Sequence, residues 1–391
     1  MNIMFDVVVV NRQSGSVACA ALRSLIESSE LSSVPVHVIL VDNGSSASDR
    51  LILDGLPPCV DRIDLPENRG FARAANLGAR RGSAPWLFFL NPDTLVMPET
   101  LRGLARHVAT DREQSLWGPR QYLDAELRFW VAPIRGTSLF GEAIDAFYDR
   151  GWTSERSRRF LTEHMKASRS SGPVRVRVLS GGALAMPRPL FDKLGGFDEG
   201  YFLYVEDTDL CVRARRLGHD AFWLPDVPVV HFVEGSTRLD RDLAMASLKK
   251  GIDRFKMTRH GWAQRLLARG LERVAQTMPR RRDRWRDASG WSSVEEFAAS
   301  SRLSSRERVF SLARSPLFDN CIHSVWDRES ETAIAGLIGG LPAGRYFARI
   351  ASLERPGCWR EDHVARIDVP VDGESSPSSS LVPATHPVGV P

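Results

Sequence analysis

Three short apolar runs constrain the fold of this chain more than any other feature. They are FDVVVV (residues 5–10), VHVILV (36–41) and WLFFL (86–90). A strand with one face in water alternates apolar and polar residues, whereas a continuous apolar run is typical of a parallel strand buried on both faces. Between or after these runs, the sequence predicts helices over about 16–26, 70–81 and 98–108. The alternation predicts an open, mainly parallel α/β sheet with flanking helices.

Polar residues follow the ends of the predicted strands. Asn11 and Arg12 come after the first strand, FDVVVV, and Asp42 after the second, VHVILV. A third predicted strand ends near Leu65, and Asn91 and Asp93 follow the fourth, WLFFL. In sheets of this class, ligands bind in the crevice at the carboxyl ends of the strands. Each residue alone is weak evidence, because Asp and Asn are also ordinary turn formers. Their shared location is the stronger argument, and it predicts a ligand site at this edge.

A second acidic site lies in GGFDEGYFLYVEDTDLCVRARRLG (195–218), where a loop becomes a helix. The apolar residues at helical spacing that supply its buried face are Leu203, Leu210, Ala214 and Leu217. Glu206 and Asp207 then stand at the helix start, where a carboxylate can take a proton from a substrate hydroxyl. Acidic residues also suit a helix N-terminus for electrostatic reasons alone. The separate acidic site at Asp93 favours the chemical interpretation, and Asp209 is expected to cap the helix.

The 391 residues exceed one ordinary domain, and composition divides them. Residues 1–236 form the α/β domain, in which AFWL and VVHF are expected to be two short strands, the second ending at His231. Residues 237–300 are predicted to be a basic helical extension, and 301–371 a small β-rich module with alternating strands. Residues 372–391 are rich in Ser and Pro and are predicted to be disordered.

Composition excludes several classes of protein. The net charge of +4 is mild and local, so no nucleic-acid partner is expected. The five cysteines are far apart, and none forms a C-x-x-C pair, which argues against a disulfide framework or a structural zinc site and for a reduced cytoplasmic compartment. No apolar run approaches the roughly 18 residues of a membrane span. The start has no basic region before its first apolar run, so we expect no secretory signal.

Six segments occur in the order that a known family shows them. They are VVVVNRQ, VDNGS, ENRGFARAANLGARR, WLFFLNPDT, LSGGALAMPRPLFDKLGGFDEGYFLYVEDTDLCVRARRLG and VVHF, over about residues 5–236. The chain thereby resembles family 2 glycosyltransferases of the GT-A fold, in style closest to bacterial rhamnosyltransferase-like members. The resemblance implies transfer of a sugar from a nucleotide diphosphate donor, with dTDP-rhamnose or a UDP-sugar as candidates, to a hydroxyl of a glycan or lipid-linked acceptor.

The resemblance also implies a divalent metal ion. A nucleotide diphosphate is a strongly anionic leaving group, and Mg²⁺ or Mn²⁺ stabilises it. Many relatives carry Asp-x-Asp where this chain has Asn91-Pro92-Asp93, as rhamnosyltransferase-like members do. Asp93 is the candidate carboxylate ligand, and the resemblance implies that His231 is a second ligand or a diphosphate contact. A structural histidine at a strand end is the alternative for His231, and the missing carboxylate leaves open whether the metal is required.

Donor recognition is expected from the first half of the chain. Asp42 is a candidate acceptor for ribose hydroxyls or the base, and a helix N-terminus preceded by Asn68, Arg69 and Gly70 suits an anion. Asn76 on that helix is either a donor contact or a packing residue. The full predicted donor-binding set is Asn11, Arg12, Asp42, Asn68, Arg69, Gly70, Asn76, Asn91, Asp93, Gly181 and Gly182. The two last glycines let the backbone approach the donor sugar, although a plain tight turn also explains them.

Asp207 is the predicted general base. A single displacement by the acceptor hydroxyl inverts the anomeric configuration, whereas retention through a covalent intermediate needs a second nucleophile on the opposite face. Glu206 is expected to hold the acceptor or to orient Asp207. The predicted activity is therefore an inverting glycosyl transfer.

Two other functions remain open from the sequence. A sugar nucleotidyltransferase would carry a Gly-rich basic loop after the first strand, and residues 11–16 (NRQSGS) hold no such cluster. A non-catalytic nucleotide-sugar-binding protein would have no reason to keep Asp42, Asp93, Glu206 and Asp207 together. Release of free nucleoside diphosphate separates transfer from both alternatives.

Residues 262–286 carry an amphipathic pattern. Their apolar stripe consists of Trp262, Leu266, Leu267, Leu271, Val274 and Met278. Eight arginines surround or follow the stripe, against two acidic residues. A basic helix with one apolar face lies on a bilayer rather than across it, so the pattern predicts docking on an anionic membrane, at the inner face of the plasma membrane. The alternative is that the stripe packs on the catalytic domain.

Overall fold

The computed structural model describes residues 3–133, 154–232, 241–277, 286–287, 308–313, 321–325, 333–334, 336–338, 344–355 and 358–369. The predicted disordered tail (372–391) lies outside the described residues. The same is true of residues 237–240, 278–285 and 288–300 of the predicted helical extension.

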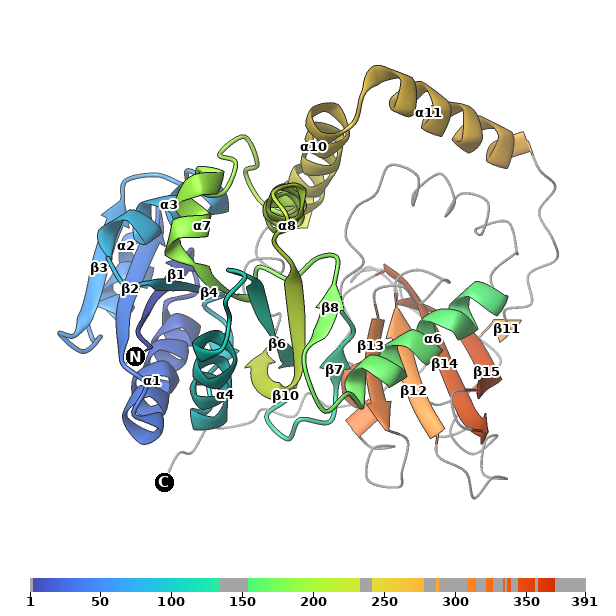
Figure 1. Cartoon of the computed structure of the whole chain (residues 1–391), viewed down its shortest axis with the longest axis horizontal. Coiled ribbons are helices and arrows are strands. Elements are labelled where there is room, and N and C mark those ends of the chain that lie inside the picture. Colours follow the sequence, from blue (N-terminus) through green and yellow to red (C-terminus); the bar gives the residue numbers. More distant parts are fainter. Residues whose placement is uncertain are drawn as a thin grey trace.

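Parallel strands form the first half of the sheet, as the apolar runs predict (Figure 1). The elements of this half are β1 (Phe5–Asn11), α1 (Gly15–Ser32), β2 (Val36–Asn43), α2 (Ala47–Leu53), β3 (Val60–Leu65), α3 (Phe71–Arg81), β4 (Trp86–Leu90), β5 (Thr94–Leu95) and α4 (Pro98–Ala109). Strand β1 lies between β2 and β4, and β2 pairs with β3, all in parallel. The carboxyl ends of β1, β2 and β4 therefore lie at one edge of the sheet, and their last residues are Asn11, Asn43 and Leu90.

Helices bury both faces of this half, and the side chains of β1 alternate between them. Phe5, Val7 and Val9 pack in one core with α1 and α4. Val8 and Val10 belong to a second core, which includes residues of α3 and of three later helices. Burial on both faces explains why these strands read as continuous apolar runs.

The sheet becomes mixed after β4. The elements that follow are β6 (Leu116–Tyr122), β7 (Trp130–Val131), α6 (Ser154–Ser168), β8 (Val174–Val176), β9 (Ala183–Pro187), α7 (Arg188–Leu194), α8 (Glu206–Arg216) and β10 (Ala221–His231). Strand β9 runs antiparallel to β4 and β6, so it begins at the edge where β4 ends. The prediction of two short strands before His231 was wrong. They are one strand, β10, whose register with β6 shifts between Leu224 and Pro228.

The C-terminal strands extend this same sheet. They are β11 (Arg286–Asp287), β12 (Arg308–Ala313), β13 (Cys321–Val325), β14 (Gly344–Arg355) and β15 (Cys358–Val369). Strand β13 pairs antiparallel with β7, which itself pairs with β6. The predicted β-rich module thus joins the catalytic sheet through two residues, Trp130 and Val131. Helix α6 contacts β15 and lies across these strands (Figure 1).

The predicted helical extension contains two described helices, α10 (Arg241–Arg259) and α11 (Trp262–Thr277), while its residues 286–287 form strand β11 instead of a helix. Phe255 of α10 packs in a small apolar cluster with Tyr201 and Val205. Arg259 of α10 pairs with Asp209, which also accepts from Arg213 at 2.6 Å. The prediction that Asp209 caps α8 was therefore wrong, because it fastens α10 to the α8 region instead. No helix in the described ranges is long and apolar enough to cross a membrane.

Candidate active site

A cavity of about 250 Å³ opens at the carboxyl edge of the parallel strands. It lies between the loops after β1, β2 and β4 on one side and the start of α8 on the other. The predicted site residues that line it are Arg12, Asn68, Gly70, Asn91, Asp93, Gly181, Gly182, Glu206, Asp207 and His231. The fold thus gathers the proposed base, the proposed metal ligands and part of the proposed donor-binding set. Asn11, Asp42, Arg69 and Asn76 do not belong to the lining.

Backbone pairing brings Asp93 and His231 together. His231 ends β10 and lies opposite Thr94 of β5 in an antiparallel pair. The N–H of Phe232 also donates to the carbonyl of Asp93 at 3.0 Å. As a result, Nε2 of His231 lies 3.2 Å from Oδ1 of Asp93, and both residues are buried. An oxygen and a nitrogen at this separation form a suitable pair of ligands for one divalent cation.

The neighbours of His231 fix the orientation of its ring. Nδ1 lies 3.0 Å from Oε1 of Gln121, and Nε2 lies 3.0 Å from Nδ2 of Asn91. Nε2 is therefore the nitrogen that faces Asp93. The Gln121 contact, at the nitrogen on the other side of the ring, is of the kind that orients metal-binding histidines.

Gly182 supplies the space that the His231 ring occupies. A Cβ atom on Gly182 would lie 2.6 Å from Cε1 of His231, which is closer than real Cβ contacts come. The histidine ring is therefore the reason why position 182 requires a glycine. Gly181 has a different role, because its N–H donates to Oδ2 of Asp207 at 2.9 Å.

Glu206 and Asp207 form a carboxylate pair at the start of α8. Glu206 is buried, and its Oε2 has no hydrogen-bond partner among the described residues. Burial and the charge of Asp207 raise the pKa of Glu206 to about 8. Burial also raises the pKa of Asp207, while the N–H groups of Gly181 and Thr208 counter this rise. The two carboxyl groups thus have different surroundings, since only Asp207 accepts from the N–H groups of Gly181 and Thr208, and different surroundings allow one to serve as an acid and the other as a base.

The backbone before this pair is strained. Tyr204 and Val205 have φ angles of +69° and +72°, a region that is unfavourable for a β-branched residue such as Val205. Helix α10 packs on the strained segment, since a Cβ atom on Gly251 would lie 3.0 Å from the carbonyl oxygen of Tyr204. Strain of this kind persists only where the surroundings enforce it. The helical extension therefore helps to hold the carboxylate pair in position.

Arg12 brings a positive charge to the cavity. Its side chain is half-buried, and the Nε atom is buried without a hydrogen-bond partner in the described part of the chain. An unpartnered buried donor costs about 1–3 kcal/mol. An anionic ligand in the cavity would satisfy it.

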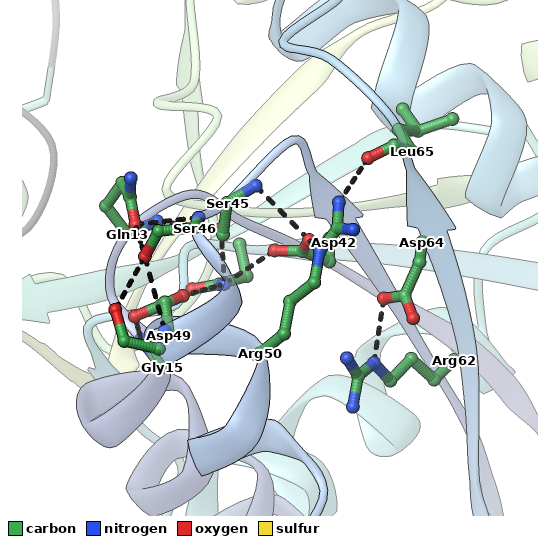
Figure 2. A network of polar contacts seen from close by, with 12 residues as sticks. Gln13, Gly15, Asp42, Ser45, Ser46, Asp49, Arg50, Arg62, Asp64 and Leu65 are labelled. Atoms are coloured by element: carbon green, nitrogen blue, oxygen red, sulfur yellow. Dashed lines mark hydrogen bonds and ion pairs between the residues drawn. The ribbon is translucent and has the colours of Figure 1, made fainter.

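Asp42 and Asn11 lie beneath the cavity rather than on its wall. The carboxylate of Asp42 accepts from Asn11 at 3.0 Å and from Nε of Arg50 at 2.8 Å, and Ser45 lies beside it (Figure 2). Asn11 also donates to Asp49 at 2.9 Å. Because both oxygens of Asp42 are engaged and the residue is fully buried, the described geometry does not support the predicted contact with ribose. These residues instead fasten the loops after β1 and β2.

Asn76 and Arg69 also face away from the cavity. The amide of Asn76 donates to the carbonyl of Phe197 and accepts from the N–H of the same residue, both at 2.9 Å. Asn76 thus connects α3 to the loop before α8. Of the two roles that the sequence left open, donor contact or packing residue, these contacts favour packing. Arg69 is exposed beside Glu67, and its N–H donates to Asn43. Asn43 also donates to Asn68 at 3.0 Å, so it fixes the loop that leads to Gly70.

Several lining residues were not foreseen from the sequence. They are Ser14, Asn43, Phe202, Leu203, Tyr204, Leu243 and Ala244. Leu243 and Ala244 belong to α10, so the helical extension closes one side of the cavity. Gln121 was missed as the partner of His231. Its position near the end of β6, at the same edge as Asp93, was the only signal available.

Comparison with known proteins gives the chemistry. Residues 6–182 match the sequence model of the family described as glycosyl transferase family 2. An N-acetylglucosaminyl-diphospho-decaprenol L-rhamnosyltransferase of Mycobacterium tuberculosis is 29% identical over 252 residues, which cover 58% of this chain and 77% of that protein. The dTDP-rhamnosyl transferase RfbF of Shigella flexneri is 23% identical, over 54% of this chain and 64% of its own.

Solved structures give weaker matches. The mannosyltransferase PcManGT from Pyrobaculum calidifontis, in complex with GDP-Man and Mn²⁺, superposes with a TM-score of 0.45 at 16% identity, over 75% of this chain and 77% of that one. GalNAc-T7 with UDP, GalNAc and Mn²⁺ superposes with a TM-score of 0.43 at 15% identity, over 71% of this chain and 56% of that chain. The family match and the rhamnosyltransferase relatives confirm the resemblance drawn from the six segments. Residues 6–182 match glycosyl transferase family 2, and the chain is a glycosyltransferase that resembles bacterial rhamnosyltransferases.

Proposed function

We propose that this chain transfers rhamnose from dTDP-rhamnose to a hydroxyl of a lipid-linked glycan, with inversion at the anomeric carbon. The observation that carries the proposal is that one cavity holds a carboxylate pair, an Asp–His pair and a half-buried arginine. Those groups match three needs of the reaction, namely a base for the acceptor, a cation site and a charge for the diphosphate. The choice of rhamnose and of the acceptor rests on the names of the two relatives.

Asp207 is the proposed general base. The acceptor hydroxyl attacks the anomeric carbon, the bond from that carbon to the diphosphate oxygen breaks, and the hydroxyl proton passes to Asp207. Its carboxylate accepts from the N–H groups of Gly181 and Thr208, which favour the ionised form and so oppose the effect of burial. Positioned base catalysis of this kind contributes roughly 10² to 10⁴ in rate.

Glu206 is proposed to act in its neutral form. With a pKa of about 8, it carries a proton at neutral pH. Its unpartnered Oε2 can then donate a hydrogen bond to the acceptor or the donor sugar. A neutral neighbour also avoids a second negative charge beside Asp207 and the diphosphate.

The diphosphate is proposed to lie between Arg12 and the Asp93–His231 pair. Asp93 and His231 would hold Mg²⁺ or Mn²⁺, and the ion would stabilise the negative charge of the leaving group. The residues present fit such an ion, because Nε2 of His231 lies 3.2 Å from Oδ1 of Asp93. Arg12 would satisfy its buried Nε on a phosphate oxygen.

A donor panel tests the proposal. The full chain, with Mg²⁺ or Mn²⁺, is mixed with dTDP-rhamnose, UDP-glucose, UDP-N-acetylglucosamine or GDP-mannose, and the thermal midpoint is measured. A donor at a hundredfold excess over its Kd adds about 2.7 kcal/mol of stability. We expect dTDP-rhamnose to raise the midpoint most and to release dTDP when a polyprenyl-diphosphate-linked N-acetylglucosamine is added. A larger shift with another donor contradicts the sugar assignment, and dTDP release without acceptor-linked rhamnose contradicts transfer.

We further propose that α11 docks the enzyme on an anionic membrane, where a lipid-linked acceptor is found. Its apolar stripe is exposed, with Trp262, Leu266, Leu267 and Val274 between 53% and 71% accessible. This exposure favours the membrane over packing on the catalytic domain, and Figure 1 shows α11 apart from the sheet. Arg269 and Arg273 are exposed on the same helix, and each contributes about 1 kcal/mol near an anionic surface. Met278 and Arg280–Arg282 lie outside the described residues.

Vesicle sedimentation tests the docking. The full chain should sediment with phosphatidylglycerol vesicles at low salt, less with neutral phosphatidylcholine vesicles, and less at high salt. Leu266→Ser with Leu267→Ser should abolish binding, and Arg269→Ser with Arg273→Ser should weaken it. Leu51→Ser is the matched control, because Leu51 is 71% exposed on α2. Absence of binding at low salt, or equal loss in the control, contradicts docking.

A further inference from the structure

A second cluster of ligand-type side chains lies in the C-terminal part of the sheet. Cys321 and His323 stand two residues apart on β13, so their side chains point to the same face. His164 of α6 meets them from the helix that crosses this face. Cys321 and His323 belong to the strand that joins β7, and none of the three residues lines the catalytic cavity.

The three potential ligand atoms point at one another. Nδ1 of His164 lies 3.1 Å from Nε2 of His323 and 3.6 Å from Sγ of Cys321, and Sγ lies 3.1 Å from Nε2. All three residues are buried, with exposures of 6%, 3% and 0% for His164, Cys321 and His323. Tetrahedral zinc, with bonds of about 2.0–2.1 Å to nitrogen and 2.3 Å to sulfur, sets nitrogens about 3.3 Å apart and nitrogen and sulfur about 3.6 Å apart. The triangle is close to that geometry.

We propose that His164, Cys321 and His323 bind one thiophilic metal ion, Zn²⁺ or Cu⁺. One thiolate and two imidazoles are a donor set that suits both ions, whereas Mg²⁺ and Mn²⁺ prefer oxygen. The ion would be independent of the proposed cation at Asp93 and His231. C-x-x-C spacing could not reveal this site, since its ligands are Cys321-Ile322-His323 and a residue of a distant helix.

The surroundings of His323 resemble the support of a metal ligand. Its second ring nitrogen, Nδ1, lies 3.0 Å from Oγ of Ser311 on the neighbouring strand β12. A polar contact at the nitrogen that does not face the metal fixes the orientation of a ligating imidazole. The ring of Trp130 lies against the same imidazole, with 4.7 Å between centroids, and limits access of water.

Nearby charges bear on the choice of ion. Arg349 is fully buried and lies 3.5 Å from Ser311, and the guanidinium of Arg120 lies 4.4 Å from the Trp130 ring centroid. Both guanidinium groups act electrostatically on His323, and their positive charge disfavours a further net positive charge at the site. Cu⁺ with one thiolate adds no net charge to this region, whereas Zn²⁺ adds one positive charge. We therefore expect Cu⁺ to bind more tightly than Zn²⁺.

The site would fasten α6 to the strand that joins the C-terminal strands to the catalytic sheet. Binding of an ion to the folded chain alone stabilises that chain by mass action. The expected result is an increase in thermal midpoint on adding the ion to metal-free protein. The catalytic residues do not contact this cluster, so the effect is expected on stability rather than on the donor-binding step.

Metal titration of the full chain tests the proposal. Metal-free protein receives Zn²⁺, Cu⁺ under anaerobic reducing conditions, or Co²⁺ as a spectroscopic probe, and bound ion is measured after gel filtration. We expect one ion per chain at this site and a thiolate-to-Co²⁺ charge-transfer band. Cys321→Ser should remove the band and the increase in midpoint, and His164→Gln should weaken binding by at least about tenfold. Cys59→Ser is the control, since Cys59 is an exposed thiol elsewhere and its loss should change neither.

The outcomes separate the metal site from a hydrogen-bonded cluster. If the Cys321→Ser variant does not fold, the His164→Gln variant and the Co²⁺ band of the wild type still decide. Wild-type protein that binds neither Zn²⁺ nor Cu⁺ overturns the proposal, because the three side chains then only hydrogen-bond one another. Binding that both variants leave unchanged overturns it as well. Neither result bears on the proposed glycosyl transfer.

Discussion

Nε2 of His231 lies 3.2 Å from Oδ1 of Asp93, and the pairing of β5 with β10 brings the two together. Backbone register thus sets the positions of the two residues. Gln121 lies 3.0 Å from Nδ1 of His231 and Asn91 lies 3.0 Å from Nε2, so both contacts orient the ring. The first two predictions test this arrangement.

Replacing Asp93 with Ala should weaken donor binding and remove the response to metal. The carboxylate is the proposed anionic ligand, and loss of metal stabilisation of the leaving group is expected to lower kcat/KM by roughly a hundredfold, equivalent to a few kcal/mol. Activity is measured against added Mg²⁺ and Mn²⁺ for both proteins. Full activity of the wild type in excess chelator would show that the metal assignment is wrong.

Gly182→Ala should disturb His231 without removing any reactive group. The new Cβ would lie 2.6 Å from Cε1 of the histidine, so the ring must shift from its position beside Asp93. We expect a loss of about 10- to 100-fold in metal-dependent activity. The control is Gly172→Ala, since no atom lies within 4 Å of a Cβ built there. Equal effects of the two substitutions would contradict the packing argument.

The rate should depend on pH with two limbs. Asp207 acts as a base only when ionised, so kcat/KM should rise with pH through its pKa, which burial places above the ordinary value. Glu206 should lose its proton near pH 8, adding a negative charge beside Asp207 and the diphosphate, so kcat/KM should fall there. The pH profile is measured for wild type and Glu206→Gln. If kcat/KM of the Glu206→Gln variant still falls near pH 8, the assignment of this fall to Glu206 is contradicted.

The free energy of unfolding should also depend on the protonation of Glu206. The pKa of Glu206 is higher in the folded chain than in the unfolded chain, so its contribution is fully present below about pH 4.5 and is lost as the pH rises through 8. Glu206→Gln should therefore be more stable than wild type at pH 8, by an amount on the order of a few kcal/mol, with a smaller difference at pH 5. Thermal midpoints at the two pH values measure this. A difference that does not change with pH would show that Glu206 is ionised in the folded chain.

The sequence predicts the first half of the sheet well, for a physical reason. Strands such as Phe5–Asn11 are buried on both faces, so apolar residues stand next to one another, as in the four consecutive valines 7–10, instead of alternating with polar ones. Asp93, Glu206, Asp207 and His231 were found because each stands at the end or start of a regular element, where the chain reaches the edge of the sheet.

Side-chain direction and long-range contacts could not be predicted in the same way. Asp42 also stands at a strand end, but its carboxylate turns to Asn11 and Arg50 instead of the cavity. Leu243 and Ala244 reach the cavity only because α10 packs on the α8 region. The pairing of β7 with β13 joins distant segments through two residues, and so short a strand leaves no periodic signal.

The most direct test of the account is the turnover of Asp207→Asn. The amide keeps the shape of the side chain and cannot take the acceptor proton, so kcat should fall by roughly 10² to 10⁴. Donor affinity, measured by titration without acceptor, should stay within about twofold of the wild-type value, because the proposed diphosphate contacts at Arg12 and Asp93 are untouched. A variant that turns over at nearly the wild-type rate would remove Asp207 from the mechanism and contradict the account.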